Sequence, residues 1–419
     1  MASYRKRGNS YEVNVSCGRD PVTHKKLFKT ATFKPDPEKT EAQNKKDLEY
    51  FMADFERSVH AGGNVSIKKT TFSDFVPIWR EEYARFELRQ NTIESYDQIL
   101  NDHVIPEIGR IRLTEISPLH LNKLYRKLSE TRKDGKKGGY PAGTIKRVHG
   151  VIGSIMAFAY KSGVIDSNPC SRATLPKDSK KELTEENYFD ETQAAAFVAY
   201  LGEPFTVERH PKNRKAYTEI CTVPEKIQIF LTMAVLTGCR RSELIALQWS
   251  DIDFEKKELT ISKATTIAQH QLITDDPKTT KSHRKLSLSD PMIEALREYR
   301  THQLQERLRI GSKWHDNNYV FTTWDGGQMR PETPYSAFKR ILKRYNDTHD
   351  DQLPDITLHG LRHTSASLLI AENVDLKTVS SRLGHSRIAT TLDVYSHAIR
   401  SKDKAAADTL SDLIYKNTK

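Results

Sequence analysis

The sequence predicts a multidomain protein: a small α+β domain at the N-terminus, an all-α domain after it, and a larger, mixed but mainly α domain with a small antiparallel sheet. Its 419 residues exceed what one hydrophobic core usually organises. Strand-like alternation occurs near the N-terminus, helical periodicity dominates the middle, and the second half mixes both. Two segments without periodicity separate these regions. We therefore expect domains over 1–63, 64–175 and 186–419, with a linker over 176–185.

The charge balance indicates a negatively charged partner. Lys and Arg total 66 against 55 for Asp and Glu, so the formal net charge is +11. The first 34 residues contain eight basic and two acidic side chains, a net +6 and more than half of the excess. A basic surface of this kind is typical of nucleic-acid binding, although many other proteins are mildly basic.

Composition excludes three classes of protein. No run approaches the roughly 18 apolar residues of a membrane helix, and no apolar stretch follows the charges at the N-terminus, as it would in a secretory signal. The cysteines lie far apart without a C-x-x-C pair, at Cys17, Cys170, Cys221 and Cys239. This spacing excludes a disulfide scaffold and a thiolate zinc site, and it fits a reducing compartment.

The first domain is expected to contain a small sheet and one helix. Residues 11–15 alternate like a strand, a turn containing Gly and Pro is expected over 17–21, and a second strand over 26–33. Residues 38–59 are typical of a helix, because apolar side chains recur at three- and four-residue spacing. Those side chains are Leu48, Phe51, Met52 and Phe55. A basic, partly disordered tail is the alternative, and the alternation favours the folded domain.

The second domain is expected to be helical throughout. Helical periodicity covers four segments: 72–87, 92–103, 117–130 and 144–162. Thr92 and Ser117 are suited to be N-caps, and Pro118 suits the first helical position after Ser117. The last helix has an apolar face, formed by Val148, Ile152, Ile155 and Phe158.

Basic side chains in these two domains are candidate contacts to nucleic acid. In the first domain the candidates are Arg5, Arg7, Lys25 and Lys26. In the second they are Lys146 and Arg147, near the start of the helix over 144–162. One basic and one apolar face is what a helix lying along DNA requires, but a solvated surface helix has the same pattern.

Three local clusters in the third domain are hard to explain by packing alone. In the first, residues 236–244, Gly238 would end an apolar helix and Arg240 would lie at the bend before the next helix. The second, residues 358–363, leads into another expected helix. The third comprises residues 383–386 and 390–397, and short strands are expected at 259–261 and 285–288.

These clusters closely resemble the motifs of the tyrosine recombinases, the family of phage and transposon integrases. The motifs are T-G-x-R-x-S-E-L at 237–244, H-x-x-R at 359–362, L-G-H at 383–385, and a tyrosine ten residues after the histidine of L-G-H. Each motif alone would be weak, but the four occur in the family's order and spacing. The resemblance covers roughly residues 186–400.

The resemblance implies strand cleavage by a tyrosine, and the residue types suit that reaction. Arg240 and Arg362 would hold the phosphodiester, because guanidinium groups donate in pairs to oxygens whose negative charge grows in the transition state. His359 would donate to the same phosphate or manage a proton, and His385 would donate to a nonbridging oxygen. Tyr395 would attack phosphorus and form a 3′-phosphotyrosyl ester. This chemistry requires no cofactor, no ATP and no metal.

Some assignments stay open. The family uses a lysine on a β-hairpin to protonate the leaving 5′-oxygen, and Lys278 matches it best, with Lys281 as the alternative. Arg241 is expected to contact DNA at the surface rather than replace Arg240. Glu243 is interpreted as structural. His359 and His363 have the spacing of a zinc pair, but the glutamate of H-E-x-x-H is missing. We therefore expect no metal.

The flanking regions also resemble parts of the family. Residues 1–63 resemble the three-stranded arm-binding domain of integrases from phages and conjugative transposons, and 64–175 resemble the helical, SAM-like core-binding domain. The tail over 402–419 would form an amphipathic helix that docks on a neighbouring subunit or on its own domain. The resemblance implies a catalytic domain at 186–419.

The resemblance further implies integration and excision of a mobile element, on double-stranded DNA and through a Holliday junction. A homotetramer would act with an excisionase or a host DNA-bending protein, in the nucleoid of the bacterial cytoplasm and away from membranes. Three alternatives are a DNA-binding regulator with a degenerate site, a type IB topoisomerase, and an RNA-binding or structural basic protein. The intact set of site residues disfavours the first, the arm-like domain the second, and the ordered motifs the third.

Overall fold

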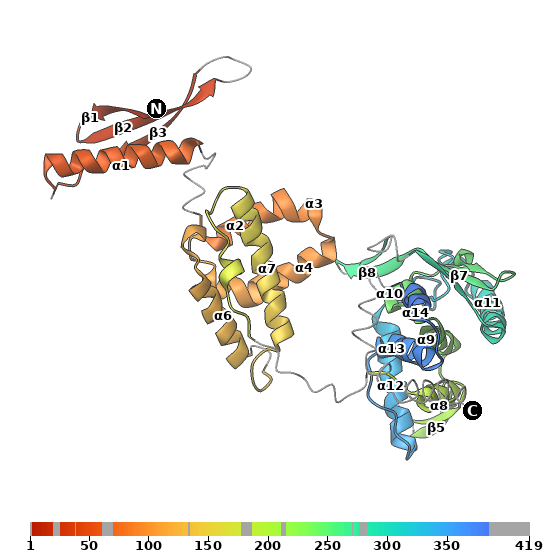
Figure 1. Ribbon diagram of the computed structural model, residues 1–419. Coiled ribbons are helices and arrows are strands. Elements are labelled where there is room, and N and C mark those ends of the chain that lie inside the picture. The colour runs from red at the N-terminus through yellow and green to blue at the C-terminus, as the bar shows by residue number, and fades with distance from the viewer. Residues whose placement is uncertain are drawn as a thin grey trace, which may run out of the picture. The chain divides into compact units, whose positions relative to one another are not determined.

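A computed structural model describes residues 2–19, 26–37, 39–60, 70–132, 135–176, 187–210, 215–269, 271–275 and 283–384. The chain divides into two compact units, Met1–Lys181 and Glu182–Lys419. The fold is helical with small antiparallel sheets (Figure 1). Among the described residues, none of the helices has the length and apolar character that crossing a membrane requires.

The N-terminal elements form a three-stranded antiparallel sheet covered by one helix. The strands β1 (Ala2–Arg7), β2 (Ser10–Arg19) and β3 (Lys26–Phe33) lie in that order, and α1 (Glu41–His60) runs along the sheet (Figure 1). The buried residues between sheet and helix are Val13, Val15, Leu48 and Phe55. The two predicted strands and the helix are confirmed, and β1 is a further strand.

The turn predicted over 17–21 is wrong where the structure describes it. β2 continues to Arg19, which pairs with Lys26 of β3, and the register shifts between Ser16 and Arg19. A bulge of this kind lets a strand pass through a glycine without ending. Gly18 therefore lies within the strand, and residues 20–25 lie outside the described residues.

The rest of the first unit is helical and has a core of its own. Its elements are α2 (Phe72–Trp79), η2 (Arg80–Ala84), α3 (Arg85–Glu87), α4 (Gln90–Ile99), η3 (Leu100–Val104), α5 (Ile105–Ile108), η4 (Leu113–Glu115), α6 (Pro118–Glu130), α7 (Ala142–Lys161) and η5 (Pro169–Arg172). Trp79 is fully buried and stacks on Tyr96. The predicted apolar face of α7 is confirmed, with Val148, Ile152 and Ile155 buried and Phe158 partly buried.

One of the two predicted N-caps in this region is confirmed. Ser117 precedes α6, its backbone N–H donates to His120 Nδ1 at 3.2 Å, and Pro118 is the first helical residue. Thr92 is not an N-cap, because α4 begins two residues earlier, after Arg89. Arg89 has the extended backbone of an N-cap, and the amide of Thr92 already donates to its carbonyl, so Thr92 lies inside the helix.

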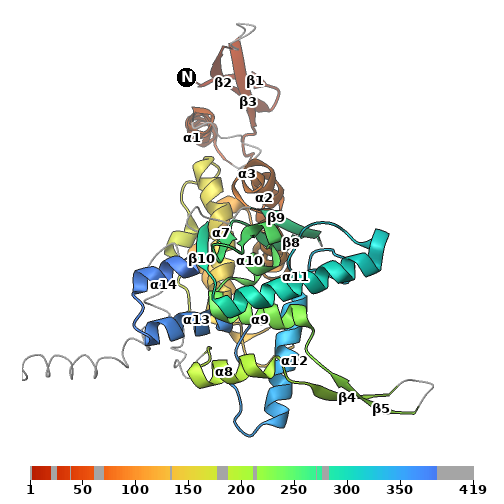
Figure 2. The same ribbon diagram turned by 90° about the vertical axis from the view of Figure 1, so that its right-hand side faces the viewer.

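The second unit surrounds the helix α9 (Glu225–Thr237), which contacts α11, α12 and α13 (Figure 2). Phe230 of α9 is fully buried and meets Phe321 edge-on, with ring centroids 4.9 Å apart. The helical elements are α8 (Glu191–Tyr200), α9, α10 (Arg241–Ile245), η6 (Trp249–Asp251), α11 (Asp290–Ile310), η8 (Gly311–Lys313), α12 (Glu332–Thr348), α13 (Gly360–Ala371) and α14 (Leu376–Leu383).

Among the described residues of the second unit, the strands form one small sheet and two hairpins. β6 (Ile252–Asp253), β7 (Glu258–Ile261) and β10 (Arg284–Ser287) form an antiparallel sheet in the order β10-β7-β6. The two predicted strands of this unit are confirmed as β7 and β10. The hairpins are β4 (Phe205–Arg209) with β5 (Tyr217–Cys221), and β8 (Ala264–Ala268) with β9 (Gln271–Asp275).

Candidate active site

The first motif forms a tight corner between α9 and α10. Gly238 ends α9 in the left-handed conformation, at φ +63°, and a Cβ there would lie 2.6 Å from Leu383 Cδ2 of α14. Both facts favour glycine, which tolerates positive φ and has no side chain to clash. Arg240 has the extended backbone of an N-cap, at φ −68° and ψ 148°, and α10 follows it. The predicted bend at Arg240 is confirmed.

The Arg240 side chain is held by Glu243. Glu243 Oε2 accepts from the Arg240 backbone N–H and Oε1 from Arg240 Nη1, both at 2.8 Å. Arg240 Nη2 donates to Gly384 O, at the end of α14, at 3.3 Å. Burial raises the pKa of Glu243, but the hydrogen bonds and charges of Arg284 and Arg240 outweigh it, so the pKa is lowered overall. The carboxylate is therefore charged at neutral pH.

Arg362 is a buried arginine with an unpaired nitrogen. It lies in the first turn of α13, is 3% exposed, and donates from Nη1 to Gly238 O at 2.8 Å. Its Nη2 has no hydrogen-bond partner among the described residues. Burial and the nearby charge of Arg240 lower its pKa to about 10. An unpaired buried donor costs free energy, which an anion at Nη2 would recover.

His359 immediately precedes α13 and lies near both arginines. Partial burial, together with His363, Arg362 and Arg240, lowers its pKa to about 4, so the imidazole is neutral at pH 7. Its ring meets that of His363 edge-on, with centroids 5.0 Å apart. Within the part of the chain that the structure describes, these histidines do not belong to a group of three His, Cys, Asp or Glu that could hold a metal.

Arg284 is a fourth charged residue of this site, and we did not predict it from the sequence. It is the first residue of β10, and its Nη2 donates to Glu243 Oε2 at 2.8 Å. A weak signal was present, since an arginine begins a strand whose next inward-facing residue, Leu286, is apolar. No motif spacing marks Arg284, because its partner Glu243 is 41 positions away.

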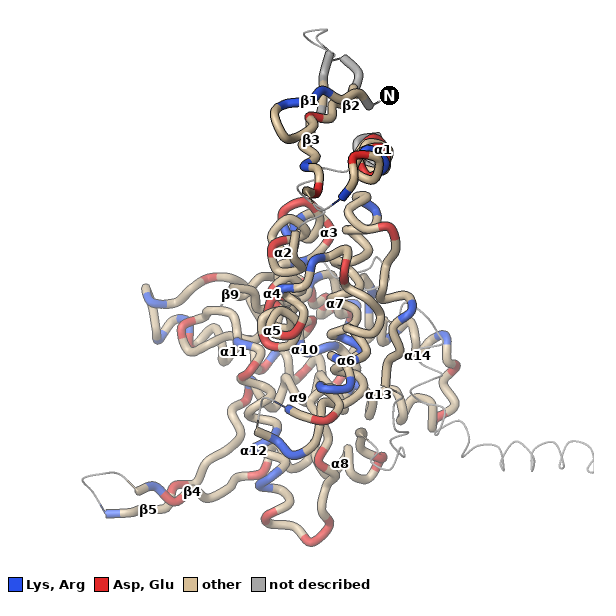
Figure 3. The backbone as a smooth tube through the Cα atoms, turned by 90° about the vertical axis from the view of Figure 1, so that its left-hand side faces the viewer, with Lys and Arg blue, Asp and Glu red and all other residues tan. Residues whose placement is uncertain are grey.

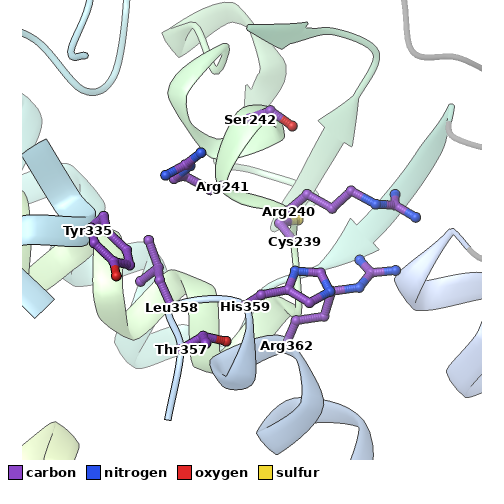
Figure 4. A pocket seen from close by; sticks show the side chains of 9 residues that line it. All are labelled: Cys239, Arg240, Arg241, Ser242, Tyr335, Thr357, Leu358, His359 and Arg362. Atoms are coloured by element: carbon purple, nitrogen blue, oxygen red, sulfur yellow. The ribbon is translucent and has the colours of Figure 1, made fainter. Parts of the chain in front are cut away.

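Arg240, Arg362 and His359 line a cavity of ≈ 380 Å³ (Figure 4). Arg240 and Arg362 extend toward the same side, with the His359 ring beside them, whereas Arg241 extends the other way, toward Tyr335. The lining residues are Cys239, Arg240, Arg241, Ser242, Tyr335, Thr357, Leu358, His359 and Arg362. The structure thus brings together three of the six predicted catalytic residues, Arg240, His359 and Arg362.

The other three predicted catalytic residues, Lys278, His385 and Tyr395, lie outside the described residues. The same holds for Lys281, the alternative hairpin lysine, for His397 and for the tail over 402–419. β9 ends at Asp275, three positions before Lys278, and the description of α14 and its C-cap ends at Gly384, directly before His385.

The candidate DNA contacts are spread over both units. Arg5 and Arg7 of β1 are exposed, and both pair with Glu12 of β2, at 2.7 and 3.0 Å. α1 packs on the face of the sheet that carries Val13 and Val15, and it contains both basic and acidic residues (Figure 3). Lys25 lies outside the described residues, and the side chain of Lys26 is not described.

The candidates on α7 and α10 are exposed. Lys146 and Arg147 lie in the second turn of α7, and Arg147 Nη2 donates to Ser95 Oγ at 3.1 Å. Arg241 donates from Nη1 to Pro331 O at 3.3 Å. His149 of α7 instead turns inward and hydrogen-bonds with Tyr125 Oη at 2.9 Å.

Comparison with known proteins decides the family. Residues 212–402 match the model of the phage integrase family, and residues 71–129 match that of the N-terminal SAM-like domain of phage integrases. The chain belongs to the phage integrase family of tyrosine recombinases. It is therefore a site-specific DNA recombinase.

Three relatives illustrate the match. The recombinase is 28% identical to a XerC-like tyrosine recombinase of Caldanaerobacter subterraneus subsp. tengcongensis, over 98% of each chain. It is 24% identical to the ICEBs1 integrase of Bacillus subtilis, over 99% of this chain and all of that one. Its fold resembles that of the Tn1549 transposon integrase in complex with a circular intermediate DNA, with a TM-score of 0.63 and 19% identity, over 81% of this chain and 99% of that one.

The depressed pKa of His359 predicts a specific pH dependence of stability. The folded recombinase, without DNA, binds a proton at His359 less readily than the unfolded chain, whose histidines titrate near pH 6.5. Wild type should therefore lose stability as the pH falls from about 6.5 toward 4, and His359→Gln should lose less. Urea denaturation at about pH 7 and about pH 5 measures this. An equal loss in both proteins would contradict it.

Proposed function

We propose that this recombinase integrates and excises a mobile genetic element through a covalent 3′-phosphotyrosyl intermediate and a Holliday junction. The observation that carries the proposal is the pair of guanidinium groups, Arg240 and Arg362, that extend to the same side of one cavity (Figure 4). One of them has a buried nitrogen without a partner among the described residues. A DNA phosphate supplies the acceptor oxygen that Arg362 Nη2 lacks.

The two arginines stabilise the negative charge that develops on the phosphate oxygens during cleavage. Attack on phosphorus produces a pentacoordinate transition state in which the nonbridging oxygens become more negative. Arg362 Nη2 donates to one of these oxygens. Arg240 donates to the other from the second N–H of its Nη2, while the first N–H keeps its hydrogen bond to Gly384 O at 3.3 Å. Because the guanidinium planes are fixed before DNA binds, little reorganisation is needed.

The covalent step exchanges one ester for another. The Tyr395 oxygen forms a bond to phosphorus while the bond from phosphorus to the 5′-oxygen breaks, so the phosphodiester energy is kept for rejoining. The His359 imidazole is neutral at pH 7, because its pKa is lowered to about 4, and it donates to the phosphate or takes part in removing the phenol proton. Lys278, or Lys281 as the alternative, gives a proton to the leaving 5′-oxygen, and His385 donates to a nonbridging oxygen. No metal or cofactor enters this step.

The N-terminal sheet is proposed to bind separate, arm-type DNA sites. Residues paired across two strands lie on the same face of a sheet, and successive residues alternate between faces. Val13 and Val15 of β2 face α1, so Glu12 and Ser10 of the same strand are on the opposite alternation and face away from it. Arg5 pairs with Glu12 and Arg7 pairs with Ser10, so both arginines lie on the face away from the helix. That face has the polar, hydrogen-bonding character of a DNA-reading surface. Lys146 and Arg147 of α7 are proposed to contact the backbone of the core site.

The domains and partners follow from this function. We propose an arm-binding domain over 1–63, a core-binding domain over 64–175, a linker over 176–185, and a catalytic domain over 186–419. Recombination joins two duplexes at four strands, which a homotetramer with one site per strand accomplishes. An excisionase or a host DNA-bending protein would set the direction, in the cytoplasm of a bacterial host. The fold shared with a transposon integrase bound to a circular intermediate DNA supports this proposal.

Covalent trapping tests the proposed nucleophile. Wild type should accumulate a protein–DNA adduct on a nicked substrate carrying the end sequence of its own element, because the cleaved fragment diffuses away and cannot rejoin. Tyr395→Phe should bind the same DNA and form no adduct, since phenylalanine has no oxygen to attack phosphorus. Denaturing electrophoresis measures the adduct.

The matched control is Tyr335→Phe. Tyr335 lines the cavity and is exposed, but it lies beside Arg241 and away from Arg240 and Arg362 (Figure 4). Tyr335→Phe should therefore form adduct like wild type. Loss of adduct in Tyr335→Phe, with adduct retained in Tyr395→Phe, would reject the assignment.

Salt dependence tests the N-terminal sheet. Arg5→Ala in the full chain should reduce the slope of log affinity against log salt by about 1 on arm-type DNA, because one phosphate contact is lost. Lys6→Ala is the control, as it removes the same charge from the helix side of β1, where Lys6 pairs with Tyr11. Equal changes in the two variants would count against the proposed face. Titration followed by fluorescence anisotropy measures the slope.

A further inference from the structure

Arg284 is a buried arginine that the proposed chemistry does not use. Its side chain is 6% exposed, and it does not line the cavity that holds Arg240 and Arg362. Its Nε donates to Arg382 O, in the last turn of α14, at 2.7 Å, and its Nη1 and Nη2 donate to Glu243 at 3.2 and 2.8 Å. A guanidinium that donates to a carbonyl on one side and to a carboxylate on the other is fixed in both plane and position.

Glu243 passes this constraint on to Arg240. Each carboxylate oxygen accepts one bond from Arg240 and one from Arg284: Oε1 from the two Nη1 atoms, and Oε2 from the Arg240 backbone N–H and Arg284 Nη2. The carboxylate is 3% exposed, so little water competes for it. If Arg284 were removed, the carboxylate could rotate, and the plane in which Arg240 is held would no longer be fixed.

The end of α14 is held by the same two arginines. Arg284 binds Arg382 O, and Arg240 binds Gly384 O. The carbonyls at a helix C-terminus lack partners within the helix and carry partial negative charge, so they suit guanidinium donors. Gly384 fits closely, with φ +68°, and a Cβ there would lie 3.0 Å from Arg284 Nη1. The contact thus connects the Arg240 corner to the element that precedes His385 in the sequence.

We infer that Arg284 is a positioning residue for strand cleavage, which fixes the Arg240 guanidinium through Glu243 and anchors it to the end of α14. The inference rests on the proposed function of Arg240 as a phosphate ligand. Arg284 acts behind Glu243 and makes no contact with DNA. A lysine at this position keeps the charge but has a single nitrogen, which cannot bridge both carboxylate oxygens and Arg382 O in one plane.

A double-mutant cycle tests the inference. The proteins are full-length wild type, Arg240→Lys, Arg284→Lys and the double variant, and the measurement is the single-turnover rate of adduct formation on nicked DNA. Each single change should slow cleavage about tenfold or more, and the double variant should be about as slow as the slower single variant, because Arg284 acts through Arg240. If the slowing in the double variant equals the product of the slowing in the two single variants, Arg284 acts independently of Arg240, and the inference is overturned. An Arg284→Lys rate within about twofold of wild type would also overturn it.

The matched control is Lys285→Ala, the next residue of β10. Lys285 is exposed and pairs weakly with Glu258 at 3.5 Å, so its loss should leave the rate near that of wild type. Thermal unfolding and DNA affinity show whether each variant is folded. If Arg284→Lys fails to fold, Glu243→Gln combined with Arg284→Gln removes both charges together and should show the same coupling to Arg240→Lys.

The outcomes separate this inference from the proposed function. A slow Arg240→Lys with a fast Arg284→Lys would overturn the positioning role alone. An Arg240→Lys variant that cleaves as fast as wild type would reject the phosphate role of Arg240, and the positioning role with it.

Discussion

The carboxylate of Glu243 is the constraint on which the rest of the site depends. Arg240, Arg284 and Arg362 lie close together, and three like charges in a partly buried site repel one another strongly. Glu243 offsets one of these charges, accepts two hydrogen bonds from the Arg284 guanidinium, and accepts one from the Arg240 guanidinium and one from the Arg240 backbone N–H. Removing one member of such a buried group typically costs about 3–5 kcal/mol. Arg240 and Glu243 are three positions apart in the sequence, and the corner between α9 and α10 brings their side chains into contact.

One carboxylate among three arginines leaves a net two positive charges, and Glu243 pairs with Arg240 and Arg284 but not with Arg362. The burial and unpaired nitrogen of Arg362 are unfavourable in the protein alone. An electropositive site that is incomplete without its substrate is expected of an enzyme that stabilises developing negative charge. Burial, together with the charges of Arg362 and Arg240, lowers the pKa of His359 and keeps its imidazole neutral.

The sequence predicted what local rules determine. Periodicity located α1, most helices of the second domain, and the strands β2, β3, β7 and β10. The motifs predicted that Arg240, His359 and Arg362 lie together, and they line one cavity because each motif lies at a helix end near α9. Two predictions from local signals were wrong. The turn expected at Gly18 does not form, because β3 pairs with β2 beyond that residue. The N-cap expected at Thr92 is wrong because α4 begins earlier, after Arg89. β1 escaped prediction because its charged residues hide the alternation.

Arg284 could not be predicted, for a different reason. Its role arises from contacts with Glu243 and with Arg382 O, 41 and 98 positions away, and no spacing in the sequence encodes them. A single arginine at the start of a strand is usually a surface residue. Only the tertiary structure shows that it is buried behind the cavity.

The most direct test of the phosphate role of Arg240 and Arg362 is the structure of the Tyr395→Phe recombinase bound to DNA containing its cleavage site, at a resolution that defines the scissile phosphate. We expect a nonbridging oxygen to lie about 2.7–3.1 Å from Arg362 Nη2, with Arg240 donating to the same phosphate. A scissile phosphate bound elsewhere, with Arg362 Nη2 still unpaired or donating to a protein carbonyl, would contradict it.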